Sequence, residues 1–157
     1  MGQIYLTQQG YDKLLHEMEY LRNVKRREIS KRIEEARAMG DLSENAEYDA
    51  AKDAQARVEG RIIELQDKLS RAVIISKSEV NLEKVSIGTK VTLKDLNSGG
   101  LLDYTIMSDE EADFSRSEIG VSSPIARGLL GKKESDTVEI TVPKGILKYQ
   151  ILKIALP

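Results

Sequence analysis

Two rows of apolar residues at helical spacing, uninterrupted by proline, most strongly constrain the fold of the first half of the chain. All three prolines lie beyond residue 120. Apolar residues that recur every three or four positions share one face of a helix. The rows are Tyr11, Leu14, Met18, Leu21, Ile29, Ile33 and Ala36, and then Ala51, Ala54, Val58, Ile62, Leu65, Leu69 and Ala72. Because only a few residues around Gly40 connect them, the sequence predicts a long antiparallel helical hairpin, a coiled coil with helices about 45 Å long.

The first row has a start signal and an interruption. Thr7 can cap the first helix, because its hydroxyl can accept a hydrogen bond from an N–H of the first turn. From Leu21 to Ile33 the row advances in steps of four residues through Lys25, which is a stutter that locally unwinds a supercoil. Small residues such as Ala36 lie near the expected turn and larger ones farther away, so we expect a slim tip.

The second half of the chain has a different periodicity. Alternating stretches rich in β-branched and apolar residues predict four strands, at residues 90–94, 102–106, 138–142 and 149–154. Between them, Ser123, Pro124 and Gly131 suit the cap, the first position and the end of a short helix. The expected fold class is therefore α+β, with a helical arm over residues 1–76 and a small, mostly antiparallel sheet domain with a short helix over residues 77–157.

The composition excludes several kinds of chemistry. The chain has no Cys and one His, which excludes disulfides, thiolate metal sites, Cys nucleophiles and His-pair metal sites. Its net charge of −2 gives no overall attraction for nucleic acid. The sequence has neither a targeting segment nor an apolar run approaching 18 residues, so we expect a cytoplasmic protein that does not contact a membrane.

The expected turn of the hairpin carries two carboxylates. Residues 40–48 read GDLSENAEY and include Asp41 and Glu44. Their spacing matches a capping box, and spacing alone favours Asp41 as the cap of the second helix. A capping role would also fix the carboxylates in place for a functional role. Because Mg²⁺ takes about six oxygen ligands, two carboxylates would not hold it alone but could complete a site on a partner.

Basic residues lie close to this turn in the sequence. If the hairpin is centred near residue 44.5, Arg37 faces Lys52 and Arg32 faces Arg57. Both pairs could contact phosphates. The alternative is a solvated helix face with intrahelical ion pairs, for example between Arg37 and Glu34.

The turn resembles the tip signature of the bacterial Gre transcript-cleavage factors, of the GreA type. A second segment that resembles this family is residues 123–132, which read SPIARGLLGK. Residues 109–114, DEEADF, and residues 6–10, LTQQG, also fit. The resemblance covers essentially the whole chain and implies an FKBP-like fold for the C-terminal domain.

The resemblance also implies a function and a set of site residues. The C-terminal domain would bind bacterial RNA polymerase at the rim of the secondary channel, and the arm would reach the polymerase active site. There the factor would stimulate Mg²⁺-dependent cleavage of the 3′ end of backtracked RNA, as an accessory factor rather than an enzyme and without binding metal alone. We expect it to be a monomer. The implied residues are Asp41 and Glu44 as the metal-associated pair, Asn45 and Tyr48 as tip support, Arg37 and Lys52 near the RNA, and Ser123, Pro124 and Ile125 at the polymerase.

Other functional classes stay open at this point. The arm could be a non-catalytic interaction or chaperone-like module, or the chain could be a channel-binding inhibitor of polymerase. Prolyl isomerase activity is not expected, because the C-terminal half offers only Tyr104, Phe114 and Tyr149 for an aromatic proline pocket. The acidic stretch at residues 109–111 is expected to form a solvated turn.

Overall fold

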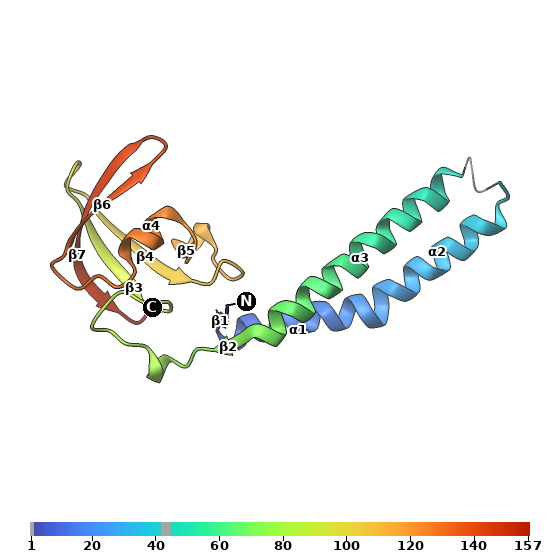
Figure 1. Cartoon of the computed structure of the whole chain (residues 1–157), viewed down its shortest axis with the longest axis horizontal. Coiled ribbons are helices and arrows are strands. Elements are labelled where there is room, and N and C mark those ends of the chain that lie inside the picture. The colour runs from blue at the N-terminus through green and yellow to red at the C-terminus, as the bar shows by residue number, and fades with distance from the viewer. Residues whose placement is uncertain (1, 42–44) are drawn as a thin grey trace. The chain divides into compact units, whose positions relative to one another are not determined.

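The computed structural model describes residues 2–41 and 45–157 of the chain (Figure 1). Their contacts separate into two compact units. The first contains residues 11–72, and the second contains residues 3–10 together with residues 73–157. Residues 3–10 therefore belong to the same unit as the C-terminal half of the chain.

The first unit is the helical hairpin that the apolar rows predict, and this prediction is confirmed. Its helices are α1 (Gln8–Tyr20), α2 (Arg26–Ala38) and α3 (Ala46–Arg71), and a π-helical segment, Leu21–Lys25, joins α1 to α2 without a break. This segment coincides with the stutter through Lys25. A π-helical turn holds more residues than an α-helical turn, so it absorbs the four-residue steps and keeps the apolar row facing α3.

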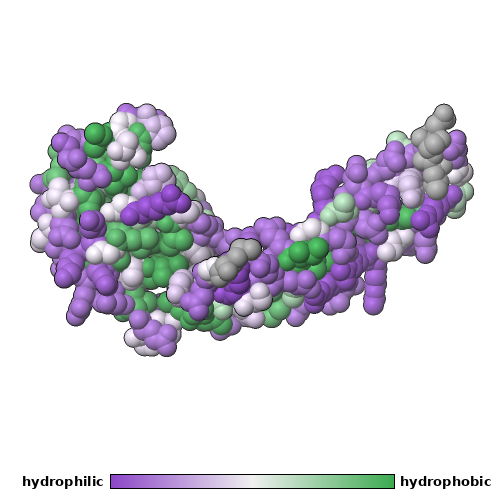
Figure 2. Space-filling model, in the orientation of Figure 1, coloured by the Kyte–Doolittle hydropathy of each residue, from purple (hydrophilic) through white to green (hydrophobic). Residues whose placement is uncertain are grey.

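One narrow row of residues forms the core between α2 and α3. Its members are aliphatic and lie on the facing sides of the two helices. They are Ile29, Ile33, Ala51, Val58 and Ile62, with Leu21, Tyr48 and Ala54 packed against them. On the face shown in Figure 2, hydrophilic residues cover most of the arm.

Two bidentate ion pairs cross between the helices of the arm. Arg26 donates to both carboxylate oxygens of Glu59 at 2.7 Å, and Arg61 donates to those of Glu17 at 2.8 and 3.0 Å. The hydrogen bond from Arg61 lowers the pKa of Glu17, and that from Arg26 lowers the pKa of Glu59. Because each pair joins one residue on each helix, the two pairs help to set the register of the hairpin.

The second unit contains a five-stranded sheet in the order β5-β4-β3-β7-β6, in which only β4 and β5 are parallel. The four predicted strands are confirmed, whereas the short β5 gave no sequence signal. The strands are β3 (Lys90–Asp95), β4 (Leu101–Met107), β5 (Glu118–Gly120), β6 (Thr137–Val142) and β7 (Gly145–Ala155). Smaller elements are β1 (Ile4–Leu6), which pairs with β2 (Ala72–Ile74), and the 3₁₀ helices η2 (Lys77–Glu79) and η3 (Phe114–Arg116).

The short helix that the sequence predicts is α4 (Pro124–Leu129), and its Ala126 and Leu129 are buried in the core of the second unit. Ser123 caps it, since its hydroxyl accepts from the Ala126 N–H at 3.2 Å. Gly128 allows the helix to approach β6 closely, because a Cβ there would lie 2.6 Å from Cγ1 of Ile140. The core of this unit is a cluster of buried apolar residues, Val85, Val91, Leu93, Ile106, Ile119, Ala126, Leu129, Val138, Ile140, Tyr149, Ile151 and Ile154.

The two units together give the α+β fold class expected from the sequence, a long helical hairpin and a mostly antiparallel sheet with a short helix. None of the helices that the structure describes combines the length and the apolar character needed to cross a lipid bilayer.

Candidate functional site

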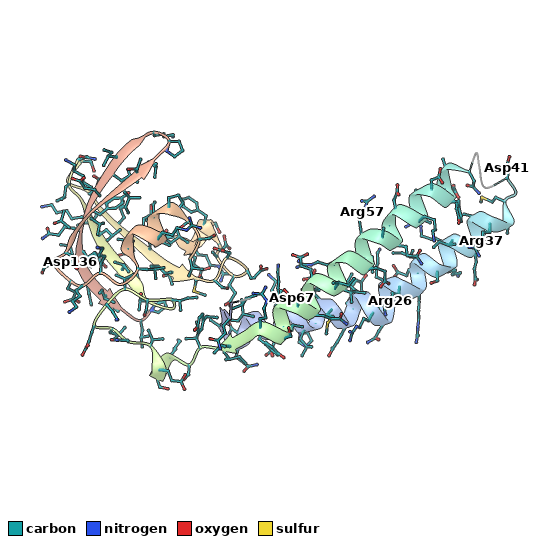
Figure 3. All side chains as sticks on the ribbon, viewed as in Figure 1. Arg26, Arg37, Asp41, Arg57, Asp67 and Asp136 are labelled. Atoms are coloured by element: carbon teal, nitrogen blue, oxygen red, sulfur yellow. The ribbon has the colours of Figure 1, made fainter. Side chains whose placement is uncertain are left out.

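Asp41 lies on the connection between α2 and α3, where the sequence predicts the tip of the arm (Figure 3). Helix α2 ends at Ala38, and the chain leaves it through Gly40, whose φ of +117° favours glycine. The side chain of Asp41 is exposed. Glu44, the second expected carboxylate, lies outside the described residues.

Asn45 joins the ends of the two helices. Its side-chain oxygen accepts from the Tyr48 N–H at 3.1 Å, and its side-chain nitrogen donates to the Ala36 carbonyl at 2.6 Å. One side chain thus serves an N–H in the first turn of α3, which has no acceptor within its own helix, and a carbonyl in the last turn of α2, which also accepts from the Met39 N–H at 3.2 Å. The geometry is that of a clasp across the base of the tip.

The prediction that Asp41 caps the second helix is wrong. Helix α3 begins at Ala46, and its cap is Asn45. Asp41 lies earlier in the chain than Asn45 and is not the residue that caps α3. The capping function and the carboxylate therefore belong to different residues of the tip.

The expected pairing of the basic residues is also wrong. Helix α2 ends at Ala38 and α3 begins at Ala46, and the contact between Arg26 and Glu59 shows that facing residues lie about four positions away from the expected register. The guanidinium of Arg37 consequently lies over the ring of Tyr48, 6.0 Å from its centroid, and does not face Lys52. Figure 3 shows Arg37 near the Asp41 end of the arm and Arg57 farther along α3.

The other basic residues are placed as follows. Lys52 is exposed on α3, and its ammonium group donates to the Gln55 side chain at 3.0 Å. Arg32 borders a hollow that it shares with Glu47 and Ala50. The tip therefore presents Arg37 and Lys52 on different levels of the arm, with an aromatic ring rather than a second cation beside Arg37.

The residues expected to contact polymerase lie in the second unit, whereas the tip residues lie in the first. Ser123 is the half-buried cap of α4, and Pro124 is exposed at its first position. Ile125 is partly buried and packs against the core of this unit. Of the three side chains, that of Pro124 is thus the most accessible.

Sequence reasoning missed the role of Glu111. The sequence predicts a solvated turn at this point. The carboxylate of Glu111 is instead half-buried against Thr7, whose N–H donates to it at 2.9 Å and whose hydroxyl also donates to it. The neighbouring Asp109 accepts from the Ser122 N–H at 3.1 Å. One signal in the sequence could have pointed to Glu111. The residue three positions after Thr7 is Gly10 instead of the Glu or Gln of a capping box, so a carboxylate for the Thr7 N–H has to come from another segment.

Comparison with protein-family models matches both parts of the chain. Residues 4–74 match the model described as "Transcription elongation factor, N-terminal", and residues 79–156 match "Transcription elongation factor, GreA/GreB, C-term". The chain belongs to the GreA/GreB family. The resemblance inferred from the tip and from residues 123–132 is thereby confirmed.

Relatives in this family match the chain over nearly its whole length. "Transcription elongation factor GreA" of Chlorobium phaeobacteroides is 49% identical over 152 residues, which is 96% of each chain. The protein of the same name in Clostridioides difficile is 48% identical over 149 residues, 95% of this chain and 94% of that one. The crystal structure of GreA factor homolog 1 of Thermus thermophilus is 31% identical, covers 97% of this chain and 98% of its own, and has a TM-score of 0.46.

The described tip residues of this GreA/GreB family member offer the kind of oxygen atom that a cation binds, but too few of them to hold a cation. Across residues 2–41 and 45–157, no three His, Cys, Asp or Glu side chains are grouped so that they could hold a metal ion. Carboxylate oxygens are the ligands that Mg²⁺ prefers. Glu47 and Asp49 add negative charge in the first turn of α3, where the helix dipole stabilises it.

Proposed function

We propose that this chain is a GreA-type elongation factor that stimulates Mg²⁺-dependent cleavage of the 3′ end of backtracked RNA in bacterial RNA polymerase. The observation that carries the proposal is the exposed Asp41 carboxylate, which follows the last turn of α2 in the two-helix arm. The matches to elongation-factor models over residues 4–74 and 79–156 support it. Acting on transcribing polymerase, the factor would work in the bacterial cytoplasm, as a monomer.

The construction of the arm is suited to entering the secondary channel of polymerase. Near the tip, the buried positions facing the partner helix are alanines, with Ala36 only 2% and Ala51 only 1% exposed. Small residues at such positions let two helices approach closely. The tip would therefore pass through a narrow opening, while the second unit would bind at the rim through Ser123, Pro124 and Ile125.

Asp41 and Glu44 would share a Mg²⁺ ion with carboxylates of the polymerase. When bound, this ion would make its water ligand more acidic and stabilise the oxygen that leaves the RNA. The chain's own contribution is to present anionic oxygens, with Asn45 holding the helix ends on either side of them. Because the ligands come from two proteins, the factor would be accessory to an active site that belongs to the polymerase.

The bases behind the carboxylates would bind the RNA. Arg37 and Lys52 are both exposed, and both are cations of the kind that contact phosphates. The ring of Tyr48 limits the positions open to the Arg37 guanidinium. Tyr48 and Asn45 would thus support the tip, whereas Arg37 and Lys52 would hold the 3′ end of the nascent RNA.

A transcript-cleavage assay on backtracked complexes tests this function. We expect Asp41→Asn and Glu44→Gln each to slow cleavage by roughly 100-fold while polymerase binding is retained, since each removes a charged ligand. Added Mg²⁺ should restore part of the rate. Asp53→Asn removes an equal charge from an exposed position on α3 and should leave cleavage unchanged.

The same assay separates the competing functions. Normal cleavage by the double variant at positions 41 and 44 would overturn the proposal and favour a plain interaction module. Slower elongation with wild-type factor, without any cleavage product, would instead identify an inhibitor.

A further inference from the structure

The first turn of α1 has a cap that is assembled from two distant segments. The Thr7 hydroxyl accepts from the Gly10 N–H at 3.0 Å, as the cap of a helix does. In a capping box, the residue three positions later returns a carboxylate to the N–H of the cap. Here the Thr7 N–H donates to Glu111, which lies 104 residues away in the chain, at 2.9 Å.

Gly10 and Glu111 fit each other sterically. A Cβ at Gly10 would lie 2.2 Å from Oε1 and 2.3 Å from Cδ of Glu111. The missing side chain of Gly10 therefore leaves the space that the carboxylate of Glu111 occupies. Residues 7, 10 and 111 form one interlocking group, which we call the α1 clamp.

Glu111 projects from a well-held turn. This turn follows β4, and the N–H groups of Glu111 and Ala112 both donate to the Ser108 carbonyl at 3.1 Å. Ser108 is itself 4% exposed. The carboxylate is thus fixed to the sheet of the second unit, and the clamp holds the first turn of α1 to the same unit.

We propose that Glu111 is a positioning residue, which anchors the start of α1 so that the tip is held steady during RNA cleavage. This inference rests on the proposed function. Residues 8–38 form one continuous helical run about 45 Å long, so a change of about 5° at its start would displace its far end by about 4 Å. A misplacement of about 1 Å in an active site can cost roughly 100-fold in rate.

The first test compares cleavage by Glu111→Ala with wild-type factor. At saturating factor we expect a cleavage rate about 10-fold lower, with the half-saturating concentration unchanged, because the polymerase-binding residues are intact. Gly10→Ala should have the same effect, since its Cβ would displace the carboxylate of Glu111. Glu83→Gln removes an exposed carboxylate of the second unit and should change nothing.

The second test separates anchoring from helix capping. The double variant Gly10→Glu with Glu111→Ala supplies the carboxylate from α1 itself, in the capping-box position and in the space that Glu111 vacates. Hydrogen exchange should then show the Thr7 and Gly10 amides protected again, whereas the cleavage rate should stay low. Restored cleavage in this variant would show that Glu111 only caps the helix and would overturn the inference.

The outcomes also distinguish this inference from the proposed function. If Asp41→Asn cleaves normally, the proposed function fails and the inference fails with it, although exchange at Thr7 still reports the clamp. If Asp41→Asn abolishes cleavage but Glu111→Ala and Gly10→Ala cleave at the wild-type rate, the proposed function stands and the anchoring role is wrong.

Discussion

The arm and the second unit bury their apolar residues in different ways. The arm has a single row between two helices, with exposed side chains on both sides of it. The second unit has one continuous core under its sheet, into which Leu93 and Ile151 are completely buried. The difference suggests a division of labour, because a thin element can present a side chain such as Asp41 to a partner, whereas stable anchoring needs a thick core.

The two regions also use charge differently. In the arm, Arg26 and Arg61 each make two short hydrogen bonds to a carboxylate on another part of the hairpin. In the second unit, the ion pair between Lys148 and Glu139 is looser, at 3.8 Å. The charged pairs of the arm therefore help to set the register of its helices, whereas the register of the sheet is set by the pairing of its strands.

The largest effect on stability is expected from truncating the core of the second unit. Leu93→Ala removes a side chain that is 0% exposed on the central strand and should lower the free energy of unfolding by about 3 kcal/mol. Hydrogen exchange should accelerate in β3 and β7 while α3 is little affected. Leu101→Ala, at a position 67% exposed on β4, should cost less than about 0.5 kcal/mol.

Equal acceleration in α3 would contradict the division between the two regions. It would mean that the arm depends on the sheet core for its own stability, rather than on its own apolar row.

A smaller effect is expected at the clasp of the tip. Asn45→Ala removes both the cap of α3 and the bond to the Ala36 carbonyl, and should destabilise the arm by about 1 kcal/mol. Amide exchange at Tyr48 measures the fraying of the first turn. Asn45→Asp keeps an acceptor for the Tyr48 N–H but cannot donate to Ala36, so it should fall between alanine and wild type.

If Asn45→Asp and wild type protect the Tyr48 amide and cleave RNA equally, the bond to Ala36 has no role at the tip. If Asn45→Asp is as frayed as Asn45→Ala, that bond rather than the cap holds the first turn.

The features of the fold that could be predicted from the sequence are those with local signals. The apolar rows gave the hairpin, and Ser123 with Pro124 gave the start of α4. The cap at Asn45 was missed because Asp and Asn cap helices about equally well, so the choice depends on where α3 begins. Glu111 was missed because its partner Thr7 is remote in the sequence, and β5 because a three-residue strand has no measurable period.

The smallest effect tests whether charge helps to hold the arm together. Arg61 lowers the pKa of Glu17 below its usual value, so the ion pair stabilises the fold above that value and is lost as the pH falls through the folded-state pKa. Because the two side chains are 34% and 38% exposed, solvent screens them, and Glu17→Gln should cost about 0.5 kcal/mol at neutral pH. Urea unfolding should show this difference near pH 7 and a smaller one in acid, as the pH falls through the folded-state pKa of Glu17 and its side chain becomes neutral like the amide. Glu19→Gln, at an exposed neighbouring position, should have no effect at either pH.

A difference that persists in acid would assign the role of Glu17 to packing. The contrast in charge between the two regions would then not explain the register of the arm.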